Sequence, residues 1–258
     1  MYSVKRMVID SVYESFSPRV EHRSENFGLS LMSQTGEKVK ICILDSGTPA
    51  HKGMNNNAES INFTKDNIID NIGHATMVSG IIGCNDNNLV GLAPNASLYF
   101  AKIIHDNCKA RFDSIIAGIL WAVIKGVDII LLPLSTNISH ISLEMAVKKA
   151  YDSNICVISS AGNNGEIEYP AVYDTVLSVG AYDISNKIAS FSAEGDFNVT
   201  GCLIETAYLN NQYAVVSGTS IAAGIAAAMC ARLIEKHKNS NTNYTVKDLY
   251  KQMQNLYL

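Results

Sequence analysis

The sequence predicts an α/β fold with three layers, in which helices cover both faces of a mainly parallel central sheet. Short apolar runs alternate with helix-like segments along the chain. Most of these runs are apolar throughout, as expected of strands that are buried on both faces of a parallel sheet. The chain has 258 residues, of which 47% are hydrophobic and 17% charged, and this suits one large domain better than two. We therefore expect a single domain over residues 1–258.

The predicted elements follow from local composition and spacing. Apolar, β-rich runs are expected to form strands at 39–44, 96–104, 127–132, 155–159 and 176–179. Helices are expected at 74–83, 112–125, 143–153, 220–236 and 245–258. Ile115 and Ile119 recur at helical spacing on one side of their segment, and Thr245 suits the N-cap of the last helix. An N-terminal segment, 1–38, precedes the first predicted strand.

Charge and hydropathy exclude several kinds of partner. The formal net charge is −4 and the isoelectric point is about 5.9, so the electrostatic attraction that nucleic acids and anionic membranes require is missing. Residues 1–10 contain Lys5 and Arg6 but no apolar run, unlike a secretory signal. The most apolar stretch, 115–134, is interrupted by charged residues and fits a buried helix and strand better than a membrane span. These observations favour a cytoplasmic protein, with the mature domain of a secreted protein as the alternative, and they indicate no oligomeric state.

The cysteines show no metal-binding pattern. The chain has Cys42, Cys84, Cys108, Cys156, Cys202 and Cys230. None belongs to a C-x-x-C pair or to a Cys/His cluster with zinc-ligand spacing. Most lie in apolar surroundings, which predicts buried free thiols, and a few disulfides remain the alternative.

Reactive side chains occur where predicted strands end and helices begin, the usual place for functional residues in parallel α/β sheets. The segments are 43–47 (ILDSG), 73–80 (GHATMVSG), 160–165 (SAGNNG) and 217–224 (SGTSIAAG). Taken singly, each has an ordinary structural interpretation: Asp45 and Asn163 as turn residues, His74 as a structural histidine and Ser220 as a helix cap. A helix N-terminus is also where negative charge that develops on a reacting group is best stabilised.

Together and in this order, these segments resemble a known family. LDSG, GHATMVSGIIG, SSAGNNG and SGTSIAA are similar to the Asp, His, oxyanion-Asn and Ser blocks of subtilisin-like serine proteases, or subtilases. The likeness extends over 39–233 and includes the segments 91–98, 169–171 and 179–181. It implies a subtilisin-like α/β/α fold and a catalytic triad in the chain order known for subtilisin.

The resemblance implies a serine endopeptidase that works through an acyl-enzyme. Ser220 would attack the peptide carbonyl, and His74 would take the hydroxyl proton and pass it to the leaving amine. Asp45 would hold the imidazole in the required tautomer. Asn163 and the backbone N–H of Ser220 would bind the oxyanion.

The resemblance also places a peptide or protein substrate as an extended strand between two edges of the protein. The implied substrate-binding residues are Lys109, Ala110, Arg111, Phe112, Pro133, Leu134, Ser135, Ser160, Ala161, Gly162 and Glu168. Plain core packing is the alternative for Phe112. In the stretch 128–137, Pro133, Ser135 and Thr136 stand where the family has small residues and glycines. Because proline lacks an N–H, this edge predicts restricted substrate choice, for example the processing of one peptide precursor.

Glu168 directly precedes Tyr169-Pro170, a position that the resemblance places at the floor of the pocket for the residue before the scissile bond. An acid at this position would favour lysine or arginine through charge pairing. The alternative is that both Glu166 and Glu168 face water.

No cofactor is expected. The loop 84–90 lies where many subtilases bind calcium, but it is shorter here. Asn85, Asp86 and Asn87 offer oxygens without forming the six to eight ligands that calcium takes, so we expect neither a tight calcium site nor another metal. The 38 residues before Val39 are too few for the long inhibitory propeptide of secreted subtilases, which again favours a cytoplasmic enzyme.

Two other functions remain open. A catalytically silent subtilase fold used as a binding or signalling module is one, and the altered edge at Pro133–Thr136 is its best support. The presence of all three triad residues and Asn163 argues for activity instead. The third hypothesis is an esterase or ligase that uses the same acyl-enzyme. Ala75, Met77 and Gly224 also depart from the family pattern, but they remove no catalytic group.

Overall fold

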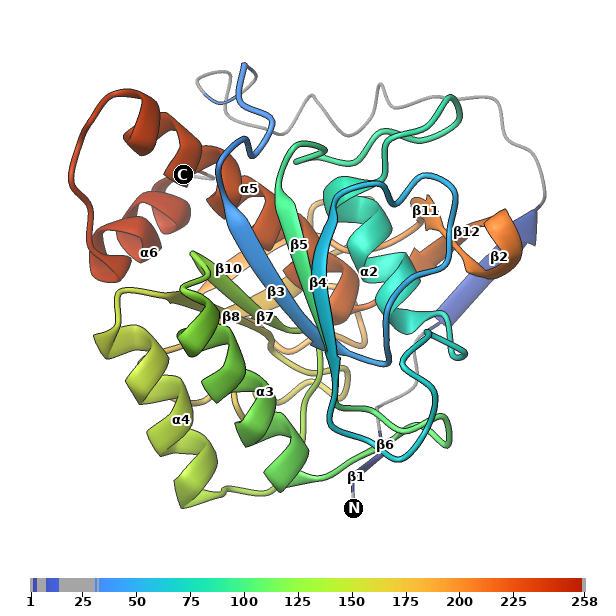
Figure 1. The fold of residues 1–258 in the computed structure, drawn as a ribbon, viewed down its shortest axis with the longest axis horizontal. Coiled ribbons are helices and arrows are strands. Elements are labelled where there is room, and N and C mark those ends of the chain that lie inside the picture. The colour runs from blue at the N-terminus through green and yellow to red at the C-terminus, as the bar shows by residue number, and fades with distance from the viewer. Residues whose placement is uncertain (1, 4–7, 14–30, 32, 257–258) are drawn as a thin grey trace.

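A seven-stranded sheet forms the centre of the protein in a computed structural model (Figure 1). The structure describes residues 2–3, 8–13, 31 and 33–256. In spatial order the strands are β10 (Phe197–Thr200), β9 (Leu177–Tyr182), β8 (Cys156–Ser160), β7 (Ile129–Leu132), β3 (Lys40–Asp45), β5 (Ser97–Lys102) and β4 (Asn57–Asn62). Every neighbouring pair in this sheet is parallel. The predicted parallel α/β sheet is therefore confirmed.

Helices cover both faces of the sheet, which gives the three predicted layers. One face packs against α3 (Phe112–Lys125) and α4 (Ile141–Asp152), and the other against α2 (His74–Gly83) and α5 (Thr219–Asn239). Successive residues of a strand point to opposite faces. Accordingly, Ile41 and Ile43 belong to the core beside α2 and α5, whereas Cys42 and Leu44 belong to the core beside α3 and α4.

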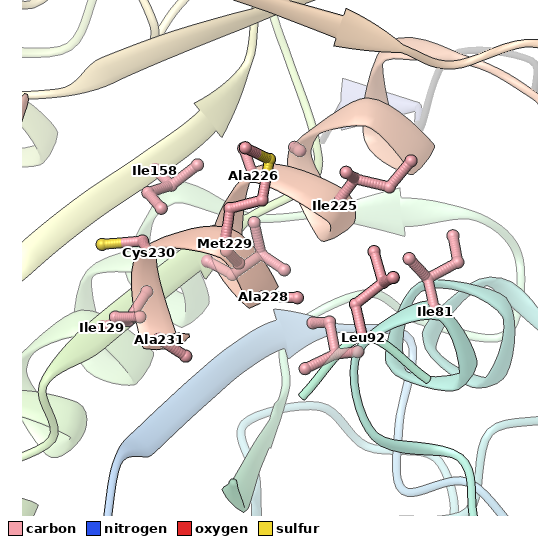
Figure 2. Close-up of a cluster of buried hydrophobic side chains, with 14 of the residues drawn as sticks. Ile81, Leu92, Ile129, Ile158, Ile225, Ala226, Ala228, Met229, Cys230 and Ala231 are labelled. Atoms are coloured by element: carbon pink, nitrogen blue, oxygen red, sulfur yellow. The ribbon is translucent and has the colours of Figure 1, made fainter. Parts of the chain in front are cut away.

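The buried helix α5 packs tightly on the sheet because its residues are small. Figure 2 shows this helix beside Ile129 and Ile158, which project from β7 and β8. Every residue from Thr219 to Ala231 is buried. Alanine and glycine let the helix backbone approach the strands closely. The first turn of α5 is hydrogen-bonded to Pro133, directly after β7.

Additional strands lie outside the central sheet. β2 (Val8–Tyr13), β11 (Ile204–Ala207) and β12 (Tyr213–Ser217) form an antiparallel sheet, in which β12 is central and is joined to β11 through the 3-10 helix η2 (Leu209–Asn211). β1 (Tyr2–Ser3) pairs antiparallel with β6 (Lys109–Ala110). The chain ends in α6 (Val246–Asn255), which packs beside α5.

Most predicted elements agree with the structure. The helices predicted at 74–83 and 112–125 have the observed bounds. Thr245 caps α6, and its hydroxyl accepts from Asp248 N at 3.2 Å. Residues 257–258 of the last predicted helix, and most of the N-terminal segment 1–38, lie outside the described residues.

No helix in the described ranges is long and apolar enough to cross a membrane. The apolar stretch 115–134 divides into most of α3, the connection 126–128, the strand β7 and the two residues that follow it. All six cysteines are described and none forms a disulfide; Cys42, Cys84, Cys156 and Cys230 are buried, whereas Cys108 is exposed.

The topology places a functional site at the carboxyl ends of β3 and β7. The chain continues from β3 to β4 and β5 on one side of the sheet, and then crosses to β7, β8, β9 and β10 on the other side. β3 and β7 are therefore the neighbours at which the strand order reverses. Such a switch point is where ligands bind in open α/β sheets.

Candidate active site

Asp45 and His74 form a buried pair at this switch point. Asp45 is the last residue of β3 and His74 the first residue of α2, and their exposed fractions are 1% and 3%. The Nδ1 atom of His74 lies 2.7 Å from both carboxylate oxygens of Asp45. Nδ1–H therefore donates to Asp45, and this tautomer leaves the lone pair of Nε2 for a base. The interpretation of Asp45 as only a turn residue does not account for this contact.

Asp70, which no sequence motif indicated, connects the turn after Asp45 to the start of the His74 helix through hydrogen bonds. Its carboxylate accepts from Ser46 Oγ (2.8 Å), Gly73 N (2.8 Å) and Thr76 N (2.8 Å). It thereby joins the turn after β3 to the first turn of α2. The acid shortly before the start of a helix was the signal available in the sequence.

Several opposing effects set the pKa of His74. Burial alone would lower it, but the charge of Asp45, the hydrogen bond to Asp45 and the charge of Asp70 outweigh burial and raise the pKa above its ordinary value. A raised pKa keeps His74 protonated to higher pH. Catalysis by the neutral imidazole would accordingly be lost on the acidic side of this raised pKa.

Asp70→Asn is expected to shift the acidic limb of the kcat/KM–pH profile to lower pH. Removing the carboxylate charge destabilises the imidazolium of His74, so the pKa of His74 falls and the neutral base persists at lower pH. Steady-state kinetics from pH 5 to 9 would measure this shift. Ser46→Ala removes one hydrogen bond to Asp70 but no charge, and should leave the limb in place. A limb that stays in place, or moves to higher pH, in Asp70→Asn would contradict the electrostatic account.

Ser220 lies in the first turn of α5 and is 8% exposed. Its hydroxyl donates to the carbonyl of Pro133 at 2.9 Å. Among the described residues, His74 Nε2 is buried without a hydrogen-bond partner. The structure thus brings Asp45 and His74 into contact, but the Ser220 hydroxyl is turned to another acceptor. Catalytic hydrogen bonds of free enzymes often form fully only with substrate bound.

Asn163 follows β8 and is oriented by the start of α5. Its Oδ1 accepts from the backbone N of Thr219 (3.0 Å) and from Thr219 Oγ1 (2.8 Å). These two bonds fix the amide so that Nδ2 remains as the donor. The first N–H groups of α5, including that of Ser220, have no partner within the helix. Both donors suit a developing oxyanion.

One of the two predicted substrate edges is a strand that already pairs. Lys109 and Ala110 form β6, opposite Ser3 and Tyr2 respectively. Arg111 is exposed and forms an ion pair with Asp113 at 2.9 Å. Phe112 starts α3, and its ring centroid lies 4.1 Å from that of His140. The Phe112 side chain is half-buried, so packing accounts for part of its surface.

The other edge follows β7. Residues 133–135 are outside regular structure, and Leu134 is buried. Thr136 exchanges two backbone hydrogen bonds with Tyr169, at 2.9 and 2.8 Å. This edge is therefore paired on one side with the segment that contains Glu168.

Glu168 is buried, with 3% of its surface exposed. Its Oε2 accepts from Ser135 Oγ at 2.6 Å, and its Oε1 accepts from Asn164 Nδ2 at 3.0 Å. A side chain on Gly162, whose φ is +124°, would lie 3.3 Å from Glu168 Cγ. The alternative that both acids face water is wrong for Glu168, whereas Glu166 is exposed. Glu168 joins the 133–135 edge to the segment after β8.

Ser160 and Ala161 are buried at the end of β8, directly before Gly162. The segments 109–112, 133–135 and 160–162 follow β5, β7 and β8, three parallel strands of the central sheet. Since parallel strands end at one edge of a sheet, these segments lie on the same side as Asp45.

An acid–histidine pair and a serine at a helix N-terminus, at the switch point of a parallel sheet, are the arrangement on which triad-type serine hydrolases depend. The model of the Subtilase family matches residues 36–255, and the chain belongs to this family.

The curated relatives are proteases. The chain is 35% identical over 224 residues to the minor extracellular protease Epr of Bacillus subtilis, covering 83% of this chain and 34% of Epr. It is 35% identical over 216 residues to subtilisin DY of Bacillus licheniformis, covering 78% of each protein. It is 33% identical over 228 residues to subtilisin E of Bacillus subtilis, covering 83% of this chain and 60% of that protein. The match spans about a third of Epr and less than two thirds of subtilisin E.

Proposed function

We propose that this protein is a serine endopeptidase that hydrolyses peptide bonds through an acyl-enzyme. The observation that carries the proposal is the buried Asp45–His74 pair, joined at 2.7 Å, at the same sheet edge as Ser220. Relatives that are named proteases, at 33–35% identity, support it. Hydrolysis of a mixed peptide library, followed by mass spectrometry and compared between the wild type and Ser220→Ala, tests it.

The reaction begins when the Ser220 hydroxyl turns from Pro133 toward His74 Nε2. Ser220 Oγ then attacks the peptide carbonyl carbon while His74 takes the hydroxyl proton. The carbonyl oxygen becomes an oxyanion, held by Asn163 Nδ2 and the Ser220 N–H. His74 gives its proton to the leaving amine, the C–N bond breaks and an ester to Ser220 remains. Water, deprotonated by His74, hydrolyses this ester and restores the serine.

The substrate would bind as an extended strand along β6. The pairing between β1 and β6 supports this, because Tyr2 and Ser3 already lie antiparallel to Ala110 and Lys109. A peptide added to the same edge would use the same backbone groups. The chain's own Tyr2–Ser3 would then compete with substrate.

Replacing both Tyr2 and Ser3 by proline is expected to lower KM by about two- to tenfold, since only one of two adjacent strand N–H groups faces β6 and the loss of that hydrogen bond weakens the competing strand by about 0.5–1.5 kcal/mol. kcat should stay the same. The matched control replaces both residues by alanine, which keeps the backbone N–H groups and should leave KM in place. An unchanged or higher KM in the proline variant would contradict competition at β6.

Glu168 would select lysine or arginine before the scissile bond. Its carboxylate accepts hydrogen bonds from Ser135 and Asn164, which hold it between the 133–135 edge and the segment after β8. A carboxylate in this position would attract a cationic side chain by charge pairing. The altered edge at Pro133 would further restrict the substrates that the protein accepts, for example to one peptide precursor.

Glu168→Gln is expected to lower kcat/KM for lysine and arginine peptides by about 10- to 100-fold, the range for losing a charge-assisted hydrogen bond. Leucine and phenylalanine peptides should change little, because glutamine keeps the size of the side chain. Matched peptide series that differ only at this residue would measure it. Glu166→Gln, the same change at an exposed neighbour, is the control. Wild-type protein that cuts lysine or arginine peptides no faster than leucine or phenylalanine peptides would disprove charge selection.

One observation favours the second candidate, a silent binding module. The hydroxyl of Ser220 donates to Pro133 rather than to His74. If that bond persists when a peptide binds, the serine is not activated and the fold only recognises extended peptides. Labelling of Ser220 separates the two candidates.

A further inference from the structure

We propose that His51, Cys84 and Asp86 form a binding site for a zinc-type divalent transition-metal ion. One ligand atom from each residue can be chosen so that all three lie within 4.8 Å of one another. The residues come from two loops. His51 lies between β3 and β4, whereas Cys84 and Asp86 follow α2. None of them takes part in the proposed proteolysis.

The donor set indicates the class of metal. An imidazole nitrogen, a thiolate sulfur and a carboxylate oxygen are the ligands that zinc takes, usually with tetrahedral geometry. Three protein ligands leave the fourth position for water. Calcium takes six to eight oxygens, and this cluster contains a single carboxylate. This donor set suits zinc better than calcium, and the proposal departs from the expectation that the protein binds no metal.

His51 is buried and incompletely satisfied. It is 5% exposed, and its Nε2 has no hydrogen-bond partner among the described residues. The backbone N–H of Gly53 donates to Nδ1 at 3.1 Å, so the proton of the neutral ring lies on Nε2. Gly53 itself borders Cys84 Sγ and Asp86 Oδ2. A metal ion would take the Nδ1 lone pair in place of this hydrogen bond and leave the proton on Nε2.

Asp86 is held in place by a surrounding shell. Its Oδ1 accepts from Asn88 N at 2.8 Å and from Leu89 N at 2.9 Å. Its Oδ2 accepts from the Tyr213 hydroxyl at 2.8 Å, and the Tyr213 ring packs edge-on against His51, with centroids 5.3 Å apart. Such outer-shell contacts orient ligands in metal sites.

The three side chains are close to coordinating distance. Cys84 Sγ lies 3.9 Å from Asp86 Oδ2. Two such ligands of a tetrahedral zinc ion lie about 3.5 Å apart, given bonds of about 2.3 and 2.0 Å. A small inward movement therefore suffices for this pair. Any side chain at Gly53 would come within 2.7 Å of Asp86 Oδ2, so glycine keeps this space open.

The bound ion would connect the two elements that carry the acid–histidine pair. The His51 loop follows β3, which ends at Asp45, and Cys84 directly follows α2, which begins at His74. A ligand that binds only the folded state stabilises it by mass action. Zinc is therefore expected to raise the melting temperature of the protein.

The test uses the full chain, freed of metal with a chelator and then titrated with Co²⁺ as a spectroscopic probe for the zinc site. We expect binding of one equivalent, with the near-ultraviolet charge-transfer band of a cobalt–thiolate bond, and displacement of cobalt by Zn²⁺. Cys84→Ser should abolish the band, whereas Cys108→Ser, at an exposed cysteine, should keep it. Circular dichroism shows whether each variant is folded.

If Cys84→Ser fails to fold, the cobalt affinity of Asp86→Asn tests the proposal instead. This variant keeps the thiolate band but, because it replaces a proposed ligand, should weaken cobalt binding by more than the roughly 10- to 100-fold that loss of an outer-shell partner costs. Absence of saturable binding of either metal to the wild type would overturn the proposal. So would a thiolate band that survives in folded Cys84→Ser, or unchanged affinity in Asp86→Asn. None of these readouts depends on proteolysis, so the metal site and the proposed protease activity can fail separately.

Discussion

Ser220→Ala is expected to lower kcat by about a million-fold, the loss known for removing the nucleophile of subtilisin, a relative of this chain. The hydroxyl forms its covalent bond to the substrate only during the reaction, so its loss affects kcat far more than KM. Hydrolysis of a fluorogenic peptide by the wild type and the variant would measure the effect. KM should change little, because the groups proposed to bind the substrate, the backbone of β6 and the carboxylate of Glu168, are unaltered.

Ser114→Ala is the matched control for this change. Ser114 is also a buried serine near a helix N-terminus, but its hydroxyl donates to the carbonyl of Phe63 at 2.9 Å. Ser114 forms no described hydrogen bond to Asp45, His74 or Ser220. Loss of its hydroxyl should therefore affect the stability of the fold, and kcat should stay within about twofold. Comparable activity in Ser220→Ala and the wild type would contradict a serine mechanism.

Asp45→Asn is expected to lower kcat by about ten-thousand-fold, the size known for the same change in a triad protease. Both oxygens of Asp45 lie 2.7 Å from His74 Nδ1. An asparagine amide can donate to Nδ1, which places the imidazole proton on Nε2 and removes the base. The positive charge that forms on His74 also loses its partner. Single-turnover kinetics at pH 8 would isolate the acylation step.

A second acid–histidine pair provides the control for Asp45. Asp66 Oδ2 lies 2.9 Å from His105 Nδ1, at exposed fractions of 32% and 13%. Asp66→Asn makes the same chemical change away from the triad and should leave kcat within about twofold, because partly exposed pairs contribute little. Equal losses in Asp45→Asn and Asp66→Asn would show that the effect is a general loss of stability.

Most strands and helices of the parallel core were predicted well because local sequence patterns indicate them. Apolar runs buried on both faces and helical periodicity located the central strands and the helices α2 and α3. The prediction missed β4 and β10, the two edge strands of the central sheet, and the sequence of β4, NAESIN, is mostly polar. The strands β1, β2, β11 and β12, outside the central sheet, were not predicted either, because strand formation there depends on pairing in the folded chain.

The candidate active site was predicted in part, because only some of its residues stand in segments with a local sequence signal. Asp45 and His74 stand at a strand end and a helix start, which the sequence displays. The contact between Ser220 and Pro133 joins residues 87 positions apart, and the burial of Glu168 depends on Ser135 from another strand end. Asp70 acts through hydrogen bonds that only the folded chain creates. The cluster of His51 with Cys84 lacks the regular spacing of a metal motif.

Intact-protein mass spectrometry after treatment with a fluorophosphonate probe asks directly whether Ser220 is an activated nucleophile. We predict one covalent adduct on the wild type and none on Ser220→Ala, because the hydroxyl turns to His74 Nε2 and attacks phosphorus. Folded wild-type protein that remains unlabelled would contradict this prediction. The bond from Ser220 to Pro133 would then describe the resting state of a protein that binds peptides without cutting them.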